Sequence, residues 1–239
     1  MTIQLYRLTD NDQFPHPDLA LDEPNGLLAY GGDLSVERLV TAYENGIFPW
    51  FSEGEPLLWW SPNPRGVLLL DDYHCTRSLA KLIRQDKYQI RFNTQFEQVI
   101  RRCANVKRSD KGTWITEDMI LAYISLHRAG FAHSVEIFNS DDVLVGGLYG
   151  VGLGKVFCGE SMFHTEANTS KLAFHALVRH MQKNGSRFID CQMQTPHLAT
   201  FGTGEIARKE FLLLLDHELT RSTGSIWREF DPYPLLSDK

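Results

Sequence analysis

The sequence lacks the apolar run that would cross a membrane and the paired cysteines that would hold zinc or a disulfide framework. No stretch of its 239 residues approaches the roughly 20 apolar residues that a bilayer-spanning helix requires. Its four cysteines stand far apart without CxxC spacing, which is typical of reduced thiols in a cytoplasmic protein. The N-terminal residues also lack the basic start and apolar core of a signal peptide. We therefore expect a cytoplasmic protein without a zinc site.

Several catalytic motifs are also missing. The chain contains neither a GxxxxGK[ST] phosphate loop nor an HExxH metal motif. The run Gly150-Val-Gly-Leu-Gly154 is not a dinucleotide fingerprint, because a predicted strand and not a helix follows it. No serine or cysteine stands at a recognisable motif spacing from a histidine and an acid. The sequence therefore gives no support to covalent acyl-enzyme chemistry.

The net charge of −6 argues against a nucleic-acid partner, but the basic residues are unevenly distributed. Residues 77–111 contain ten Lys or Arg and three Asp or Glu, a local charge of +7 that leaves −13 for the rest of the chain. Arg77, Lys81 and Arg84 have the spacing of one helix face. A solvated helix face is the usual explanation of such a run. Because few acids are interleaved, a surface for a phosphate backbone is an equal alternative.

The first 66 residues differ in character from the rest. The pair Gly31-Gly32 predicts a turn, and Ser35 predicts the N-cap of a helix that stops at Gly46. Three tryptophans between residues 50 and 60, among prolines, indicate either a small packed core or a stacking platform. Prolines at positions 62 and 64 favour a boundary, so we predict domains over residues 1–66 and 67–239.

From residue 67 the patterns alternate between strands and helices. We expect helices after the N-caps Thr76 and Thr116, after a capping box at residues 94–97, and over residues 169–183 and 207–219. Strands are expected over residues 67–71, 132–138, 143–151, 155–157 and 188–192. This order predicts an α+β fold with the layout of an N-acyltransferase, in which a small α/β domain precedes the larger one.

A candidate polar site lies where two of these stretches meet. In the strand over residues 188–192, a period of two places Asp190 and Gln192 on one face and Cys191 on the other. Facing a mobile corner at Glu160, this pair would form the floor of a pocket, although Asp190 could instead only cap a turn. Such a floor suits attack by an amine, since an α-amino group has a pKa of about 7.7–8.0 and positioning alone contributes about 7–11 kcal/mol.

Eight blocks of the sequence together resemble bacterial leucyl/phenylalanyl-tRNA–protein transferases. Each block is weak alone, but the set follows the family's order and extends over nearly the whole chain. The blocks are Asn25–Asp33, Gly46–Trp50, Trp59–Arg65, Gly112–Ile115, Ala132–Glu136, Leu144–Gly150, Phe157–Phe163 and Phe188–Gln192.

The resemblance implies an aminoacyltransferase. It would move Leu, Phe and less readily Met from aminoacyl-tRNA to proteins with N-terminal Arg or Lys, marking them for degradation in the N-degron pathway. It also implies a monomer without a cofactor. Its second domain would be GNAT-like, that is, acetyltransferase-like, with a mostly antiparallel central sheet flanked by helices.

The resemblance further implies a role for each site residue. Asp190 and Gln192 would orient or deprotonate the acceptor amine, and Glu160 would hold Gln192 and the substrate amino group. Trp50, Trp114 and Ser161 would contact the 3′ end of the tRNA. Arg77, Lys81 and Arg84 would receive its acceptor stem. The pocket for the transferred side chain would comprise Leu148, Phe157, Met162, Phe174, Leu177 and Ile189.

Alternatives and departures accompany this interpretation. A GNAT-like acyl-CoA N-acyltransferase should carry a pyrophosphate loop, and none is found; a non-catalytic tRNA-binding module would leave the three polar residues unexplained. Many family members have Ser-Leu-Gly-Ala where this chain has Thr200–Thr203, and Ala where it has Thr169. Strict alternation also sets Ile189 opposite Asp190, so both line one cavity only if a bulge intervenes. Because the amine is nearly competent, we expect positioning and not deprotonation.

Overall fold

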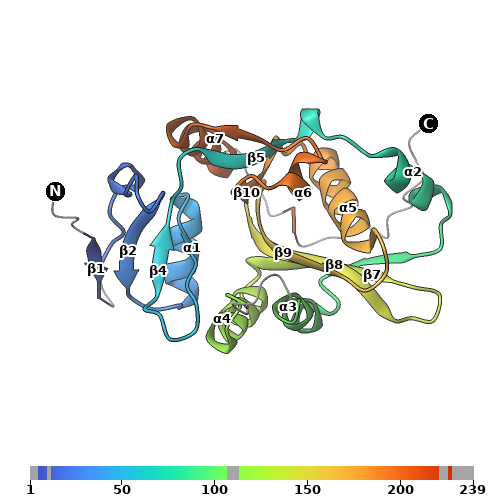
Figure 1. Cartoon of the computed structure of the whole chain (residues 1–239), viewed down its shortest axis with the longest axis horizontal. Helices are drawn as coiled ribbons and strands as arrows, with labels where there is room; N and C mark the ends of the chain where they lie inside the picture. Colours follow the sequence, from blue (N-terminus) through green and yellow to red (C-terminus); the bar gives the residue numbers. More distant parts are fainter. Residues whose placement is uncertain (1–4, 10–11, 107–112, 221–225, 228–239) are drawn as a thin grey trace.

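The computed structural model describes residues 5–9, 12–106, 113–220 and 226–227. Two β-sheets and their helices form two lobes that lie side by side (Figure 1). In the part of the chain that is described, no helix is both long and apolar enough to cross a membrane.

The N-terminal lobe is built on a four-stranded sheet in the order β1-β2-β4-β3. Helix α1 (Val36–Glu44) lies beside it and begins at the predicted cap, where the Ser35 hydroxyl accepts a hydrogen bond from the N–H of Arg38. Gly46, at φ +70°, reverses the chain after the helix. The strands are β1 (Tyr6–Leu8), β2 (Leu27–Gly31), β3 (Phe48–Pro49) and β4 (Leu58–Trp60), and a 3₁₀ turn covers Pro17–Leu19.

The larger lobe is built on a seven-stranded sheet in the order β11-β5-β10-β9-β8-β7-β6. Strands β9 and β10 run parallel, joined by helix α5, and the other neighbouring strands described in this sheet run antiparallel. The strands are β5 (Arg65–Leu69), β6 (Gln89–Phe92), β7 (Ala132–Phe138), β8 (Leu144–Leu153), β9 (Val156–His164), β10 (Phe188–Gln192) and β11 (Gly204–Ile206). The α+β fold with a mostly antiparallel sheet is therefore as predicted, and the likeness to acetyltransferases stays a prediction.

Helices cover both faces of this sheet (Figure 1). Helices α3 (Phe96–Ala104) and α4 (Glu117–Arg128) pack on one face, and α5 (Thr169–Lys183) packs on the other with α2 (Arg77–Arg84) against it. The remaining helices are α6 (Pro196–Ala199), α7 (Arg208–Thr220) and the 3₁₀ turn Leu70–Asp72. Every residue of β8 is buried, as expected for a strand covered on both faces.

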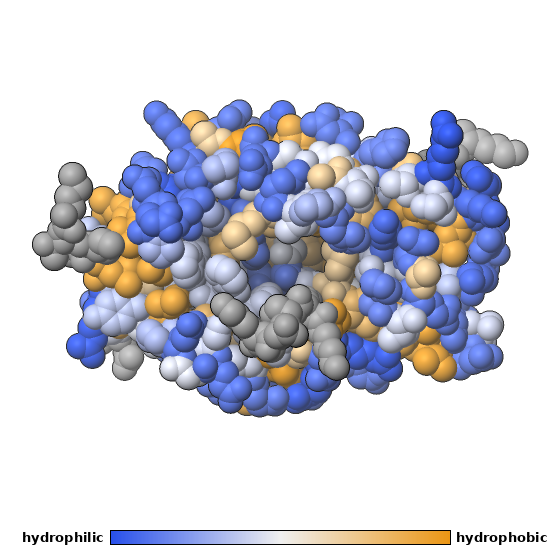
Figure 2. All heavy atoms as spheres, viewed as in Figure 1, coloured by the Kyte–Doolittle hydropathy of each residue, from blue (hydrophilic) through white to orange (hydrophobic). Residues whose placement is uncertain are grey.

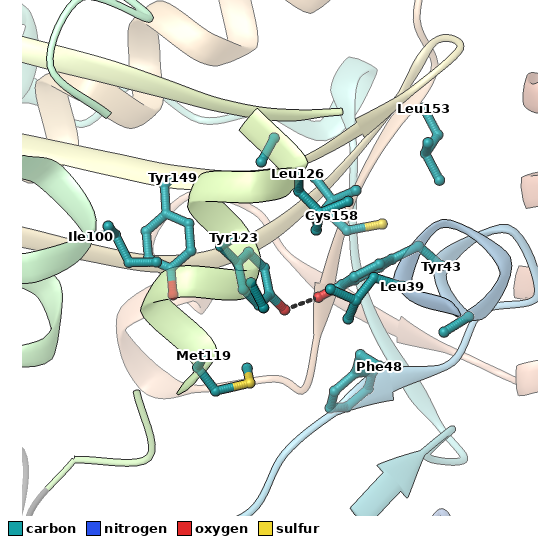
Figure 3. Close-up of a cluster of buried hydrophobic side chains, with 14 of the residues drawn as sticks. Leu39, Tyr43, Phe48, Ile100, Met119, Tyr123, Leu126, Tyr149, Leu153 and Cys158 are labelled. Atoms are coloured by element: carbon teal, nitrogen blue, oxygen red, sulfur yellow. Dashed lines mark hydrogen bonds between the residues drawn. The ribbon is translucent and has the colours of Figure 1, made fainter. Parts of the chain in front are cut away.

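The apolar cluster beneath α3 and α4 continues into the N-terminal lobe. Leu39 and Tyr43 of α1 pack in the same cluster as Met119 and Tyr123 of α4 (Figure 3). The chain passes from the smaller sheet to the larger between Trp60 and Arg65. A domain boundary at residue 66 stays a prediction, because the two sheets share this core.

Most of the local signals predicted element bounds well, with two exceptions. The threonines at positions 76 and 116 cap α2 and α4 as predicted. The capping box at residues 94–97 is wrong: the buried carboxylate of Glu136 instead accepts the backbone N–H groups of Thr94 and Gln95, at 3.3 and 3.4 Å. The mobile corner at Glu160 is also wrong, because the residue lies within β9, paired with β8.

Candidate functional site

A cavity of about 340 Å³ lies where the two lobes meet. In the view of Figure 2, the surface of the molecule has a hollow near its middle, with apolar residues along part of the rim. Strands β8, β9 and β10 and helix α5 form its walls, and β3 of the N-terminal lobe closes one side. All of the residues predicted for the aminoacyl pocket line it: Leu148, Phe157, Met162, Phe174, Leu177 and Ile189.

The residues predicted to contact the 3′ end of a tRNA line the same cavity. They are Trp50, Trp114 and Ser161. Trp50 is 40% exposed, and its ring centre lies 5.5 Å from that of Trp60, whose indole N–H donates to the Trp50 carbonyl at 2.7 Å. Trp59, in contrast, is fully buried. The tryptophan group therefore combines the two alternatives. Trp59 belongs to the packed core, while Trp50 is exposed enough to stack on a base.

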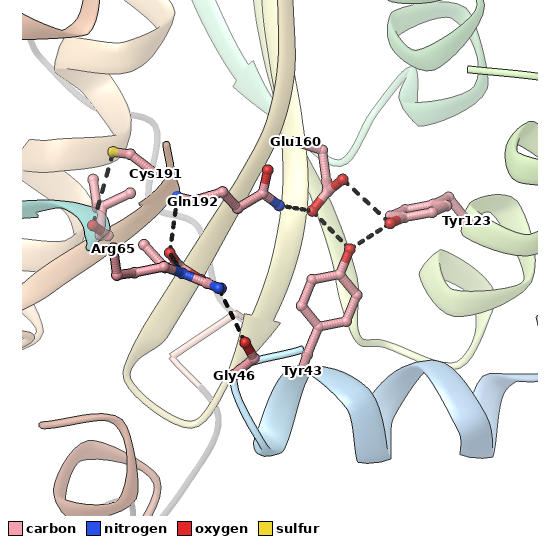
Figure 4. Close-up of polar contacts among 9 residues, drawn as sticks. Tyr43, Gly46, Arg65, Tyr123, Glu160, Cys191 and Gln192 are labelled. Atoms are coloured by element: carbon pink, nitrogen blue, oxygen red, sulfur yellow. Dashed lines mark hydrogen bonds and ion pairs between the residues drawn. The ribbon is translucent and has the colours of Figure 1, made fainter. Parts of the chain in front are cut away.

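The polar end of the cavity is organised around the carboxylate of Glu160 (Figure 4). The amide nitrogen of Gln192 donates to its Oε1 at 2.7 Å, and the hydroxyl of Tyr43 donates to the same oxygen at 2.7 Å. The hydroxyl of Tyr123 donates to Oε2 at 3.2 Å and also lies within hydrogen-bond distance of Tyr43. One acid on β9 thus accepts hydrogen bonds from α1 of the N-terminal lobe and from α4 and β10 of the larger lobe.

Burial raises the pKa of Glu160 to about 7. The three hydrogen-bond donors act against this shift, and the nearby charge of Asp190 adds to it. Burial, together with the charge of Glu160, raises the pKa of Tyr43 and that of Tyr123 well above the usual value, so both phenols stay neutral and donate. The site therefore contains a carboxyl group that changes protonation near neutral pH.

Asp190 does not line the cavity, contrary to the prediction that it shares a face with Gln192. The register of β10 shifts between these two residues, and Gln192 adopts φ +61°. The bulge turns Gln192 into the cavity beside Ile189 and Cys191, while Asp190 is fully buried on the other side. Simple alternation was wrong because it assumes an unbroken strand. The conflict between Ile189 and Asp190 disappears, since only Ile189 faces the cavity.

The partner of Asp190 is Arg65. Its Nε and Nη2 donate to the two carboxylate oxygens at 2.8 and 2.6 Å, and its Nη1 donates to the carbonyl of Gly46 at 3.0 Å. Asp190 Oδ1 also accepts the backbone N–H of Gln192 at 2.9 Å. Asp190 therefore holds the bulge in place, and its two oxygens are occupied by neighbours within the protein.

Sequence reasoning missed Arg65, Tyr43 and Tyr123 as site residues. Each tyrosine occupies the apolar face of a helix that was correctly predicted. A buried tyrosine usually needs a partner for its hydroxyl, and that requirement is a signal that could have pointed to a polar site. Arg65 closed one of the family-like blocks, but a sequence does not show whether an arginine is buried.

The rim of the cavity follows β10. Met193, Thr195, His197 and Leu198 line it. Gln194 is held by Thr203, whose hydroxyl donates to the amide oxygen at 2.5 Å while the amide nitrogen donates to the Thr203 carbonyl at 2.7 Å. Residues 200–203, which differ from the family pattern, thus contact the rim of the cavity and not the polar end of the cavity.

Ion pairs neutralise part of the basic stretch, with acids on the same helix and on other segments. Arg101 pairs with Glu97 and Glu117, and Arg91 pairs with Asp142. Three basic side chains remain exposed on α2, those of Arg77, Lys81 and Arg84. The further predicted basic residues at positions 107, 108 and 111 lie outside the described residues. No cluster of His, Cys, Asp or Glu that could hold a metal is found in the described part of the chain.

Comparisons with known proteins identify the family of this chain. Residues 32–63 match the model of the leucyl/phenylalanyl-tRNA protein transferase N-terminal domain, and residues 67–216 match that of leucyl/phenylalanyl-tRNA protein transferase. A transferase of this name from Pseudoalteromonas atlantica is 57% identical over 88% of this chain and 89% of its own. One from Cellvibrio japonicus is 53% identical over 92% and 94%, respectively.

Among solved structures, L-PGS from Bacillus licheniformis aligns with a TM-score of 0.40 and 10% identity, covering 84% of this chain and 75% of its own. The sequence relatives and the two family matches decide the assignment. The chain belongs to the leucyl/phenylalanyl-tRNA–protein transferase family of aminoacyltransferase enzymes.

Proposed function

We propose that the protein transfers Leu, Phe and Met from aminoacyl-tRNA to the α-amino group of proteins with N-terminal Arg or Lys. The transfer would take place in the cytoplasm and mark the acceptors for degradation in the N-degron pathway. The observation that carries this proposal is a single cavity with an apolar end and a polar end. The apolar wall suits the transferred side chain, and the titratable Glu160 suits the attacking amine.

The reaction forms one bond and breaks one. The acceptor nitrogen attacks the ester carbonyl carbon of the aminoacyl-tRNA, a C–N bond forms, and the C–O bond to the terminal ribose breaks. The ribose oxygen leaves with the tRNA and takes up the proton that the amine nitrogen loses. Because an ester is already activated, holding the two groups at reacting distance contributes most of the acceleration.

The apolar end explains a shared preference for Leu, Phe and Met. Met162 and Leu177 lie in a wall made of flexible or branched side chains together with two phenylalanines, Phe157 and Phe174. Hydrophobic cavities discriminate weakly among apolar shapes of similar size. A charged or strongly polar side chain would lose its hydration there without gaining a partner.

The polar end would hold the acceptor amine. An ionised Glu160 accepts hydrogen bonds, so it can take one from the amine in place of, or beside, its present donors. With a pKa of about 7, this carboxyl is also close to the amine in proton affinity. Gln192 keeps its amide oxygen for the acceptor, since its nitrogen is engaged with Glu160. Asp190 positions Gln192 and does not contact the amine.

The tRNA would approach across the aromatic edge and the basic helix. Trp50 and Trp114 offer ring faces to the terminal adenosine, with Ser161 beside them. The exposed Arg77, Lys81 and Arg84 of α2 would contact the phosphates of the acceptor stem. Such contacts position a duplex without reading its sequence, which suits an enzyme that uses tRNAs for several amino acids. The site is complete within one chain, so we propose a monomer.

The test is transfer of labelled Phe from Phe-tRNA to a peptide that begins with Arg, beside one that begins with Ala. We expect an RNase-sensitive signal that depends on the Arg. Gln192→Ala should reduce it strongly, whereas Gln98→Ala, which alters a glutamine on the outer side of α3, should not. Tight tRNA binding without transfer would instead favour a binding module.

A further inference from the structure

Arg65 is the one fully buried arginine in the described residues, and it lies between the two lobes. It begins β5, and its guanidinium carbon lies 4.9 Å from the ring centre of Phe48 and 4.5 Å from that of Phe211. The two phenylalanine rings pack against the guanidinium, and its N–H groups donate to Asp190 and to the Gly46 carbonyl (Figure 4). It therefore contacts β3, α7 and β10 at once.

One branch of this arrangement leads to Gln192. The Arg65 fork fixes both oxygens of Asp190, and one of them accepts the backbone N–H of Gln192. Gln192 sits in the left-handed region of φ, which residues other than glycine rarely adopt, so this hydrogen bond helps to hold an uncommon conformation. That conformation brings the amide nitrogen to Glu160. The geometry of the acceptor side of the cavity thus depends on a fixed position of the Asp190 carboxylate.

The other branch leads to Trp50. The Gly46 carbonyl that accepts from Arg65 stands at the start of the segment containing Phe48 and ending at Trp50. Phe48 pairs in β3 with β4 and also packs on the guanidinium. Trp50 then lines the cavity, on the side proposed for the tRNA 3′ end. The donor side therefore depends on the same guanidinium.

We infer that Arg65 is a positioning residue for aminoacyl transfer and that it sets the spacing between Gln192 and Trp50. This inference rests on the proposed function. Arg65 does not line the cavity, so it acts through Asp190 and Gly46. A planar fork is needed, because Nε and Nη2 point at one carboxylate while Nη1 points at a carbonyl on the other lobe. A lysine ammonium would keep the charge but could not reach both partners in this geometry.

The experiment compares Arg65→Lys with Gln192→Ala and with the double variant. Rates of Phe transfer to an Arg peptide are measured over a range of peptide concentrations, and Phe-tRNA affinity and melting temperature are measured for each protein. Arg208→Lys is the matched control. Arg208 is another buried arginine between the lobes; it donates to the Ser61 carbonyl at 2.6 Å, yet it contacts neither Asp190 nor the cavity.

We expect Arg65→Lys to lower kcat by about tenfold or more while the protein stays folded at the assay temperature. In the Gln192→Ala background the same substitution should lower kcat by no more than about threefold, since residues that act through one another are not additive. The affinity for Phe-tRNA should fall in both backgrounds, because the Trp50 branch remains. Arg208→Lys should lower the melting temperature without changing kcat.

Equal kcat losses from Arg65→Lys in both backgrounds would overturn the inference, and so would a loss matched by Arg208→Lys at equal melting temperature. If Arg65→Lys does not fold, Asp190→Asn tests the same branch, since it keeps an oxygen for the Gln192 N–H but breaks the ion pair. It should lower kcat, and again much less beside Gln192→Ala. A wild-type protein without Arg-dependent transfer would refute the proposed function itself.

Discussion

Replacing Glu160 by Gln should remove a pH dependence from the stability of the protein. The carboxyl has a pKa of about 7 in the folded protein and 4.5 as a model group, so between these values the folded chain binds a proton that the unfolded chain has released. A raised folded-state pKa means that this contribution to stability is fully present below pH 4.5 and is lost as the pH rises through 7.

The size of the effect follows from the difference in pKa. A difference of about 2.5 units, at 1.36 kcal/mol per unit, gives about 3 kcal/mol as the upper limit. Glu160 is only partly shielded from solvent, which screens its charge, so we expect about 1–3 kcal/mol. The substitution preserves most contacts. The amide oxygen of Gln can accept from Tyr43 and Gln192, and its nitrogen can donate to the hydroxyl oxygen of Tyr123.

The assay is urea unfolding of wild type and Glu160→Gln at several pH values between 5 and 8. The free energy of unfolding of wild type should fall relative to that of the variant as the pH rises, because other titrating groups are shared and cancel in the difference. Glu37→Gln, on the exposed side of α1, is the control and should show no such trend. A constant difference between wild type and Glu160→Gln across the range would refute the reasoning.

Three further predictions concern the cavity wall, a helix start and the rim. Leu177→Phe should fill part of the apolar end and lower kcat/KM for Phe-tRNA relative to Leu-tRNA by about tenfold, measured with both donors. Glu136→Ala should leave the N–H groups at the start of α3 without their acceptor and lower the free energy of unfolding by about 1–3 kcal/mol in urea titrations. Thr203→Ala should release Gln194 beneath the rim and raise KM for the acceptor peptide by about two- to fivefold at unchanged kcat, in steady-state assays, because one neutral hydrogen bond is worth about 1 kcal/mol.

The parts of the fold that the sequence predicted well depend on local signals. Ser35, Thr76 and Thr116 cap helices by bonding to the N–H three residues later, an interaction contained within four residues of the chain. The capping box failed for the complementary reason. The acceptor for Thr94 is Glu136, which lies 42 positions away on β7, and no local pattern records that contact.

The candidate site was predicted in a different way. Its apolar wall and its aromatic edge came from the resemblance to a family, and the cavity does contain each of those side chains. Periodicity alone could not have gathered them, because they come from loops, strands and a helix spread between residues 50 and 189. The tyrosines that donate to Glu160 belong to helices that were predicted, but their hydroxyl groups meet only in the folded protein.

The turn of Asp190 away from the cavity shows why local rules fail at this site. A five-residue strand of apolar and small polar residues is expected to alternate, and the start of β10 does so. The alternation breaks at Gln192, whose backbone is held in an unusual conformation by Asp190, and Asp190 is in turn held by an arginine 125 positions earlier. Such a conformation costs free energy and persists only where the surroundings impose it. It occurs at the residue whose amide reaches Glu160, so the long-range ion pair that defeats the local rule also places the amide at the polar end of the cavity.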